Sequence, residues 1–278
     1  MPKNAFYEHE LKQEDYSSIL IDKRPNGVVV ATLNRPDRLN AVIPSMHHEI
    51  LSLARDIDED PAVKVLVITG AGRAFCAGGD AMEFDPGDME VERDRSPGAA
   101  WREGRRLVDD FLDCETPIIT AVNGPAIGMG STIALLGDIV IAGRSARIGD
   151  THVRLAMGAG DGGQVLWPLL MGINRAKYYM MTGDILSADE AERLGLVNFV
   201  VDDDQLMKTA LDLADRLAAG PGVAISASKM GINKFQKFVS NLVLPLTIAL
   251  EAGSLRSEDA AEAFKAFQEK RKPKFTGR

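Results

Sequence analysis

Cysteine is scarce in this chain: among its 278 residues it occurs only at Cys76 and Cys114. Two cysteines cannot form a framework of several disulfides, and no set of cysteines and histidines has the spacing of a metal site. The formal net charge of −8 disfavours nucleic acid and anionic membranes as partners. Long apolar runs are also missing. No run reaches the roughly 18 residues needed to span a bilayer, and the first residues lack the apolar core of a secretory signal. We therefore expect a cytoplasmic protein that uses no metal ion and binds neither nucleic acid nor membrane.

What the sequence does contain is typical of a large α/β domain. Short apolar runs alternate with helical patterns, which predicts βαβ units and a largely parallel sheet. The first two strands are expected at 19–22 and 28–33, followed by a helix over 44–60 that Pro44 is placed to start. Further buried strands are expected at 65–69, 118–122 and 139–142.

The chain from Asp203 onward has an almost wholly helical pattern, with breaks expected near 220–222, Pro245 and Ser257. The segment 85–98 differs from its surroundings because it is acidic, carries prolines and glycines, and has no periodic pattern. We predict that it forms a mobile loop beside a functional site.

Two glycine turns follow two of the predicted strands. Residues 75–80 follow the strand at 65–69, and residues 126–131 follow the strand at 118–122. Small residues leave backbone N–H groups uncovered, and such groups can stabilise an oxyanion. The pair of turns therefore predicts two N–H donors that share one carbonyl oxygen, although a glycine turn alone often has only a conformational role.

Six motifs together resemble the enoyl-CoA hydratase/isomerase family, the crotonase superfamily. The resemblance covers roughly residues 17–276, nearly the whole chain. The motifs are 34–41, 74–80, 121–130, 179–184, 188–198 and 266–273. This resemblance implies an α/β fold, namely a crotonase-like spiral of ββα repeats with a C-terminal helical trimerisation region. The expected parts are an N-terminal extension at 1–16, the spiral core at 17–203 and the helical region at 204–278, assembled as a homotrimer or a dimer of trimers.

The resemblance also implies how a substrate is held. The backbone N–H groups of Gly79 and Met129 would bind the carbonyl of an acyl-CoA thioester, so that coenzyme A is part of the substrate and no separate cofactor is needed. The expected substrate-binding residues are Arg38, Leu39, Ala77, Gly78, Gly128 and Lys270. For Lys270, in the basic stretch 270–272, a solvated charged tail is the alternative.

The acid/base groups depart from the family pattern. A hydratase of this family carries two glutamates that activate a water, and their positions here hold Thr132 and His152. Addition of water to a double bond needs both a base and an acid. The sequence therefore disfavours the simple hydratase mechanism. Thr132 itself is expected to be a packing residue.

The substituted positions resemble 6-oxocamphor hydrolase, a member of the superfamily that cleaves a carbon–carbon bond. His152 and Asp161 lie nine residues apart, and at this spacing they match a dyad that activates water. His47 and Glu251 also match. The ordinary turn at 128–130 does not match, because the hydrolase has a histidine there.

Each of these residues has a simpler explanation that the sequence leaves open. Asp161 could cap a helix that begins at Gly162, and His152 could be a buried structural imidazole. His47 could be a packing residue of its helix. Glu251 lies either on the solvent face or buried with a partner.

The sequence leaves three functions open. The first is an enoyl-CoA hydratase/isomerase-type enzyme acting on an acyl-CoA thioester through an enolate, with His152 and Asp161 replacing the usual glutamates. The second is a hydrolase that cleaves a carbon–carbon bond of a β-dicarbonyl substrate. The third is a non-catalytic acyl-CoA binder. For the enzymes, His152 is expected to act as general base, with a pKa raised above its usual 6.5 by an ionised Asp161.

Overall fold

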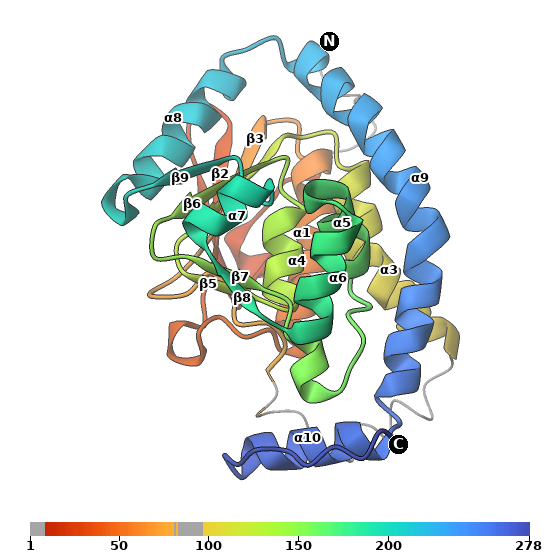
Figure 1. Cartoon of the computed structure of the whole chain (residues 1–278). Coiled ribbons are helices and arrows are strands. Elements are labelled where there is room, and N and C mark those ends of the chain that lie inside the picture. The colour runs from red at the N-terminus through yellow and green to blue at the C-terminus, as the bar shows by residue number, and fades with distance from the viewer. Residues whose placement is uncertain (1–8, 81, 83–96) are drawn as a thin grey trace.

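The computed structural model describes residues 9–80, 82 and 97–278, and its architecture is a pair of sheets surrounded by helices (Figure 1). The predicted loop at 85–98 lies outside the described residues, except that its last two residues begin a helix. Within the described residues no single helix is both long and apolar enough to cross a membrane. Among these residues, one bent pair of helices, α9 (Gly222–Ser254) and α10 (Glu258–Gln268), passes that test by length and composition.

The main sheet has six strands in the order β1-β2-β3-β4-β6-β9. Only β1 and β2 pair antiparallel, and every other neighbouring pair in this sheet is parallel, as the alternating pattern predicts. The strands are β1 (Ile19–Lys23), β2 (Val28–Leu33), β3 (Val65–Gly70), β4 (Ile118–Val122), β6 (Ile139–Gly143) and β9 (Phe199–Val201).

A second sheet of three short strands lies beside the first. Its order is β5 (Pro125–Ile127), β7 (Arg147–Gly149) and β8 (Ile185–Ser187). β5 pairs parallel with β7, which brings Ile127 opposite Gly149. This pairing is what places the residues after β7 beside the second glycine turn.

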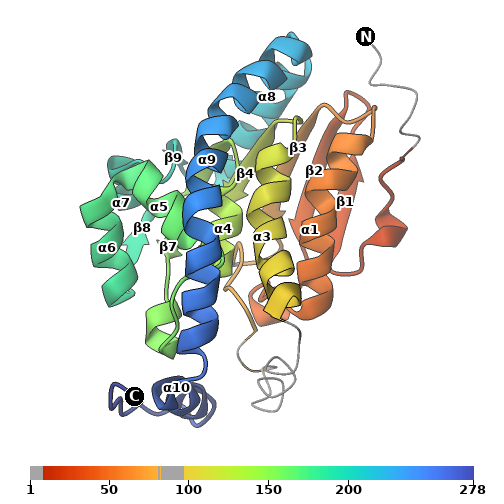
Figure 2. The same cartoon turned by 90° about the vertical axis from the view of Figure 1, so that its right-hand side faces the viewer.

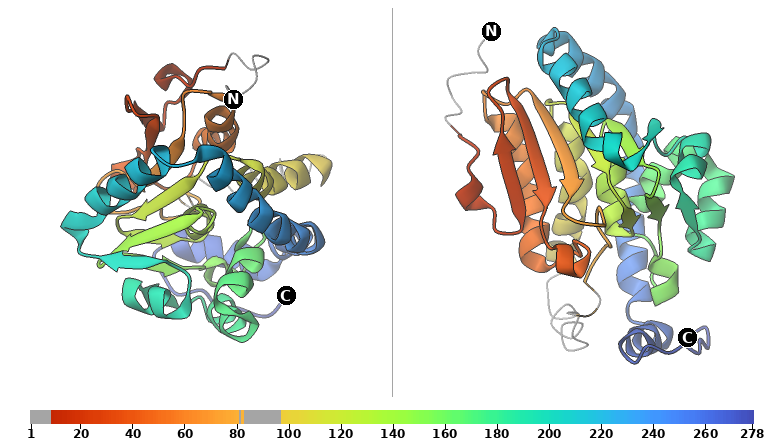
Figure 3. Two further views of the ribbon diagram at one scale, coloured as in Figure 1. Left: turned by 90° about the horizontal axis from the view of Figure 1, so that it is seen from above. Right: turned by 90° about the vertical axis from the view of Figure 1, so that its left-hand side faces the viewer.

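Helices cover both faces of the main sheet. On one face, side chains such as Val29 and Leu33 pack against α1 (Pro44–Glu59) and α3 (Pro97–Asp113). On the other face, Val28, Val30 and their neighbours pack against the later helix α8 (Leu206–Ala218). Figure 3 (right) views the sheet from the α8 side, with α1 and α3 behind it. Burial on both faces explains the continuous apolar runs that predicted these strands.

Four shorter helices complete the core. They are α4 (Met129–Leu135), α5 (Gly163–Met171), α6 (Ile173–Thr182) and α7 (Ala188–Leu194). Of these, α4 follows the second glycine turn directly and is buried from Gly130 to Leu135. The N-terminal end of α4 is therefore held rigidly by the core.

Three helices form the C-terminal region: α8 (Leu206–Ala218), α9 (Gly222–Ser254) and α10 (Glu258–Gln268). The predicted break at 220–222 is confirmed, and so is the break at Ser257, whose hydroxyl caps α10 by accepting from the N–H of Ala260. The predicted break at Pro245 is wrong, since α9 continues through it. Proline removes one backbone hydrogen bond. The packing of α9 along α3, visible in Figure 2, offsets that loss.

Candidate active site

The two glycine turns meet, as the sequence predicts. Cys76 and Ala126 form a parallel bridge, and the N–H of Ile127 donates to the carbonyl of Cys76 over 2.9 Å. A Cβ atom at Gly130 would lie 2.1 Å from the carbonyl oxygen of Cys76, so only glycine allows this approach. The thiol of Cys76 is fully buried, and burial raises its pKa to about 12, which leaves no nucleophilic thiolate.

Each turn presents one backbone donor. Within the described part of the chain, neither the N–H of Gly79 nor that of Met129 has a hydrogen-bond acceptor. Met129 is the first residue of α4, where an N–H has no partner inside the helix. On either side of Gly79, Val42 donates to Gly78 over 2.8 Å and accepts from Asp80 over 3.0 Å, which fixes the first turn.

Hydrogen bonds and ion pairs of polar side chains stabilise the first turn. The fully buried Asn40 donates to the carbonyls of Ala74 and Phe75 over 2.8 and 3.2 Å. Arg38, predicted to bind substrate, pairs instead with Asp80 at 2.9 Å. Burial alone raises the pKa of the Asp80 carboxyl, but hydrogen bonds from the neighbouring arginines outweigh it and lower that pKa below its usual value. This arginine therefore has a structural contact, and a role in substrate binding stays a prediction.

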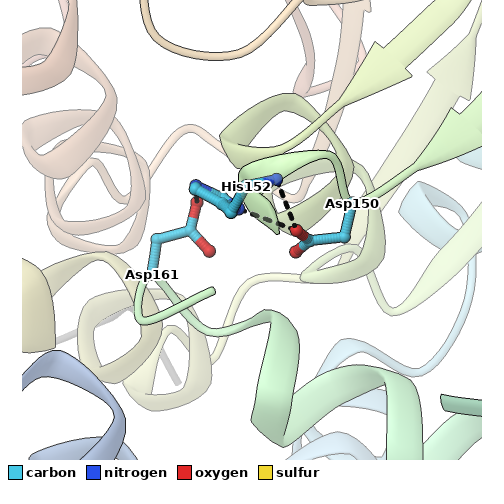
Figure 4. A group of neighbouring side chains, drawn as sticks. All are labelled: Asp150, His152 and Asp161. Atoms are coloured by element: carbon cyan, nitrogen blue, oxygen red, sulfur yellow. Dashed lines mark hydrogen bonds and ion pairs between the residues drawn. The ribbon is translucent and has the colours of Figure 1, made fainter. Parts of the chain in front are cut away.

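His152 lies among three carboxyl groups, and Figure 4 shows its ring between two of them. Its Nδ1 lies 2.7 Å from Oδ1 of Asp150. Its Nε2 lies 3.6 Å from Oδ2 of Asp161 and 3.8 Å from Oε1 of Glu251. The structure thus brings three predicted site residues together and adds Asp150, which was not among the expected site residues.

Asp161 reaches this cluster from the loop before α5. It is not the N-cap residue, because α5 begins at Gly163 and Gly162 occupies the cap position. Its Oδ1 accepts from the hydroxyl of Thr132 over 3.1 Å. Thr132 is therefore more than the packing residue that was expected. Asp161 Oδ2 is buried and, among the described residues, has no hydrogen-bond partner.

Glu251 reaches the cluster from α9, 90 residues beyond Asp161 in the chain. The alternative left open by the sequence is settled, because this carboxyl group is largely buried and has a partner in His152. A Cβ atom at Gly160 would lie 2.4 Å from Oε2 of Glu251, so the loop approaches α9 closely only because it has no side chain there. The N–H of Gly158 also donates to the Ser254 hydroxyl of α9 over 3.0 Å.

Burial and mutual charge shift the titration of this cluster. Burial by itself lowers the pKa of His152, but the carboxylates of Asp161, Asp150 and Glu251 raise it to about 10. Burial and then Asp161 raise the pKa of Glu251 to about 7, despite the opposing charge of His152. Burial also raises the pKa of Asp161. The pKa of His152 moves in the expected direction, which favours the protonated ring at neutral pH.

The acid/base cluster adjoins the oxyanion turns. A Cβ atom at Gly128 would lie 3.5 Å from Cε1 of His152, and Gly128 donates its own N–H to the carbonyl of Gly149 over 2.9 Å. Gly128 precedes Met129, so the imidazole lies against the turn that carries one of the two donors. Donors and titratable groups therefore share one side of the molecule.

The remaining predicted site residues are Leu39, Ala77, His47 and Lys270. The carbonyl of Leu39 accepts a hydrogen bond from the N–H of Ala77 over 3.0 Å, which joins the segment around Leu39 to the first glycine turn. His47 lies half-buried on α1, with its ring centroid 6.3 Å from that of His48. Lys270 is exposed just after α10. The site roles of His47 and Lys270 remain predictions.

The donor atoms of Asp150, His152 and Asp161 lie within 4.8 Å of one another, the only such group of possible metal ligands in the described ranges. The 2.7 Å contact between His152 Nδ1 and Asp150 is a hydrogen bond, however. This geometry is that of a carboxylate–imidazole pair, so distances alone do not make the group a metal centre.

Comparisons with known proteins identify the family of this chain. A model of the enoyl-CoA hydratase/isomerase family matches residues 23–278. The chain is 37% identical over 260 residues to 1,2-epoxyphenylacetyl-CoA isomerase of Escherichia coli, covering 91% of this chain and 96% of that protein. It is 34% identical over 259 residues to a short-chain-enoyl-CoA hydratase of Clostridium acetobutylicum, covering 93% and 97%. The solved structure of an enoyl-CoA hydratase/isomerase from Mycobacterium paratuberculosis superposes with a TM-score of 0.81 at 33% identity, covering 89% and 97%.

Proposed function

Because this chain belongs to the enoyl-CoA hydratase/isomerase family of enzymes, we propose that it converts an acyl-CoA thioester through an enolate held between the N–H groups of Gly79 and Met129. The observation that carries this proposal is the pair of N–H groups, on two turns in contact, that have no acceptor within the described residues. Donors fixed before the reaction stabilise negative charge as it develops on the thioester oxygen.

In this proposal the His152 cluster supplies the acid and the base in place of two glutamates. With its pKa raised to about 10, His152 is an acid at neutral pH and donates its Nε2 proton to the α-carbon. Glu251, with a pKa of about 7, is available in its ionised form to accept a proton from water or from substrate carbon. Asp161 faces Nε2 of His152 and holds the imidazole ring or the water in position. The general-base role first assigned to His152 therefore passes to a carboxylate.

The first test is turnover of a panel of acyl-CoA thioesters, both α,β- and β,γ-unsaturated. We expect hydration or double-bond migration, detected by mass spectrometry and by loss of enoyl absorbance. Tight binding of a thioester without turnover would replace this proposal by the non-catalytic binder. If calorimetry detected no binding of any CoA thioester, that result would contradict both the enzyme and the non-catalytic binder.

The second candidate is a hydrolase resembling 6-oxocamphor hydrolase, which cleaves a carbon–carbon bond of a β-dicarbonyl compound. One observation favours it: Nε2 of His152 lies 3.6 Å from Asp161, the pair that would activate water. In that reaction water adds to one carbonyl, the bond to the neighbouring carbon breaks, and the enolate released takes up a proton. Formation of a carboxylic acid from a free β-diketone, without activity on thioesters, would favour this candidate.

We also propose that residues 204–278 are a trimerisation region and that the protein acts in the cytoplasm as a homotrimer or a dimer of trimers. An apolar stripe on α9 supports the assembly, since its members recur every three or four residues and are more than half exposed. They are Ile232, Phe235, Phe238, Leu242, Leu246 and Leu250.

For the assembly, we expect light scattering to give the mass of three or six chains. Changing Phe235 and Leu242 together to glutamate should lower that mass to one chain, because two charges would be buried in the contact. Leu20→Glu on the edge strand β1, which is 47% exposed, is the matched control and should leave the mass unchanged. A wild-type mass of one chain would contradict the proposal.

A further inference from the structure

Asp150 holds the nitrogen of His152 that lies away from the other carboxyl groups. One oxygen, Oδ1, lies 2.7 Å from Nδ1 and also accepts the backbone N–H of His152 over 3.2 Å. The side chain of Asp150 is only 1% exposed. A carboxylate accepts hydrogen bonds but cannot donate them. An ionised Asp150 therefore requires that the proton of His152 sits on Nδ1.

The opposite nitrogen is the one left for proton exchange. Nε2 faces Asp161 and Glu251 at 3.6 and 3.8 Å, distances longer than a hydrogen bond. Asp161 and Glu251 come from the loop before α5 and from α9. They and Asp150 are the charged groups that act most strongly on the ring.

The local fold fixes Asp150 with respect to the oxyanion turn. Asp150 directly follows β7, and the last residue of β7, Gly149, accepts the N–H of Gly128 over 2.9 Å. A Cβ atom at Gly163 would lie 2.5 Å from Oδ2 of Asp150, so the first residue of α5 leaves room for this carboxyl group. Both constraints belong to the backbone, so the position of Asp150 does not depend on a bound substrate.

We propose that Asp150 is a positioning residue, which keeps the proton of His152 on Nδ1 and directs Nε2 toward the substrate carbon; this rests on the acid/base role proposed for His152. The simpler alternative is that Asp150 only orders the short turn His152–Leu155 through the backbone N–H of His152. The two differ in whether loss of the charge changes the state of the imidazole.

Nitrogen-15 NMR of the histidines separates these alternatives without any substrate. The chain has four histidines, and His152 is assigned by its absence from spectra of His152→Ala. In the wild-type protein at high pH, we expect neutral His152 to carry its proton on Nδ1. A neutral ring with its proton on Nε2 would overturn the proposal, and the tautomer itself is read in the wild-type protein.

The variant Asp150→Asn supplies the second measurement. An amide can rotate and donate a hydrogen bond to Nδ1, which moves the ring proton to Nε2. The same change at the orienting aspartate of a serine protease produces the wrong tautomer and lowers kcat about 10⁴-fold. We expect the titration of His152 to move to lower pH and kcat to fall roughly 10²–10⁴-fold with KM changed only a few-fold. Unchanged tautomer and titration in the folded variant would overturn the proposal.

Asp60→Asn is the matched control, because Asp60 is also buried and hydrogen-bonded but lies at the end of α1, paired with Lys23 at 2.9 Å. It should lower the melting temperature and leave the His152 titration unchanged. If no thioester is turned over, the proposed function fails, yet the NMR result still decides the role of Asp150.

Discussion

Replacing His152 by alanine is expected to lower kcat by roughly 10²–10⁴-fold, the usual contribution of a general acid or base. The ring is 12% exposed and interacts with three carboxyl groups, so the substitution removes a positive charge that lies among them. His48→Ala is the matched control, because His48 is exposed on α1 and should leave kcat unchanged. Full activity of the folded His152→Ala variant would show that the imidazole is structural, and Glu251 or His47 would then become the candidate catalytic group.

The pH profile should distinguish the roles within the cluster. A base with the raised pKa of Glu251 is active only when deprotonated, so kcat/KM should rise as pH increases through about 7. An acid with the raised pKa of His152 is active only when protonated, so kcat/KM should fall as pH increases through about 10. In His152→Ala the upper limb should vanish. The lower limb should move to higher pH, because the imidazolium lowers the pKa of Glu251.

The opposite profile would reverse these roles. If the neutral imidazole were the base, kcat/KM would keep rising toward pH 10 in the wild-type protein. Measuring kcat/KM rather than kcat reports the free protein, to which the described geometry refers.

The sequence predicted the strands and the meeting of the two turns because both depend on local patterns. Val65–Gly70 and Ile118–Val122 are buried at every position, and continuous apolar runs reveal such strands directly. The turns follow two neighbouring parallel strands, β3 and β4, so both begin at the same edge of the sheet. The prediction at Pro245 was wrong because the rule that proline breaks helices neglects the packing of α9 along α3.

The acid/base site could be predicted only in part, because its members meet through tertiary contacts. Glu251 belongs to a helix whose sequence pattern fits either burial or exposure. The cap that the sequence offers for Asp161 is wrong, and only the fold shows that Thr132 binds this carboxyl group. For Asp150 the sequence does carry a signal, since an acidic residue two positions before a histidine can return to its Nδ1. The division of the chain at 16/17 and 203/204 remains a proposal.

The oxyanion donors allow a test that separates the backbone N–H from the side chain. Gly79→Pro removes the N–H and should lower kcat by roughly 10²–10³-fold, the usual cost of losing one such donor. Gly79→Ala is the matched control, because no atom of the described residues lies within 4 Å of a Cβ atom at this position and the N–H is kept. Melting temperatures of both variants show whether the turn still folds.

A vibrational measurement on the wild-type protein makes this test independent of proline's effect on the turn. Two donors on one carbonyl oxygen weaken the C=O bond, so the thioester carbonyl stretch of a bound, non-reacting acyl-CoA should move to lower frequency. Gly79→Ala should retain the shift and Gly79→Pro should lose part of it. Because the N–H groups of Gly79 and Met129 lie on turns joined at Cys76 and Ala126, we expect a single carbonyl to meet both. An unshifted carbonyl in the wild-type complex would mean that the thioester binds elsewhere.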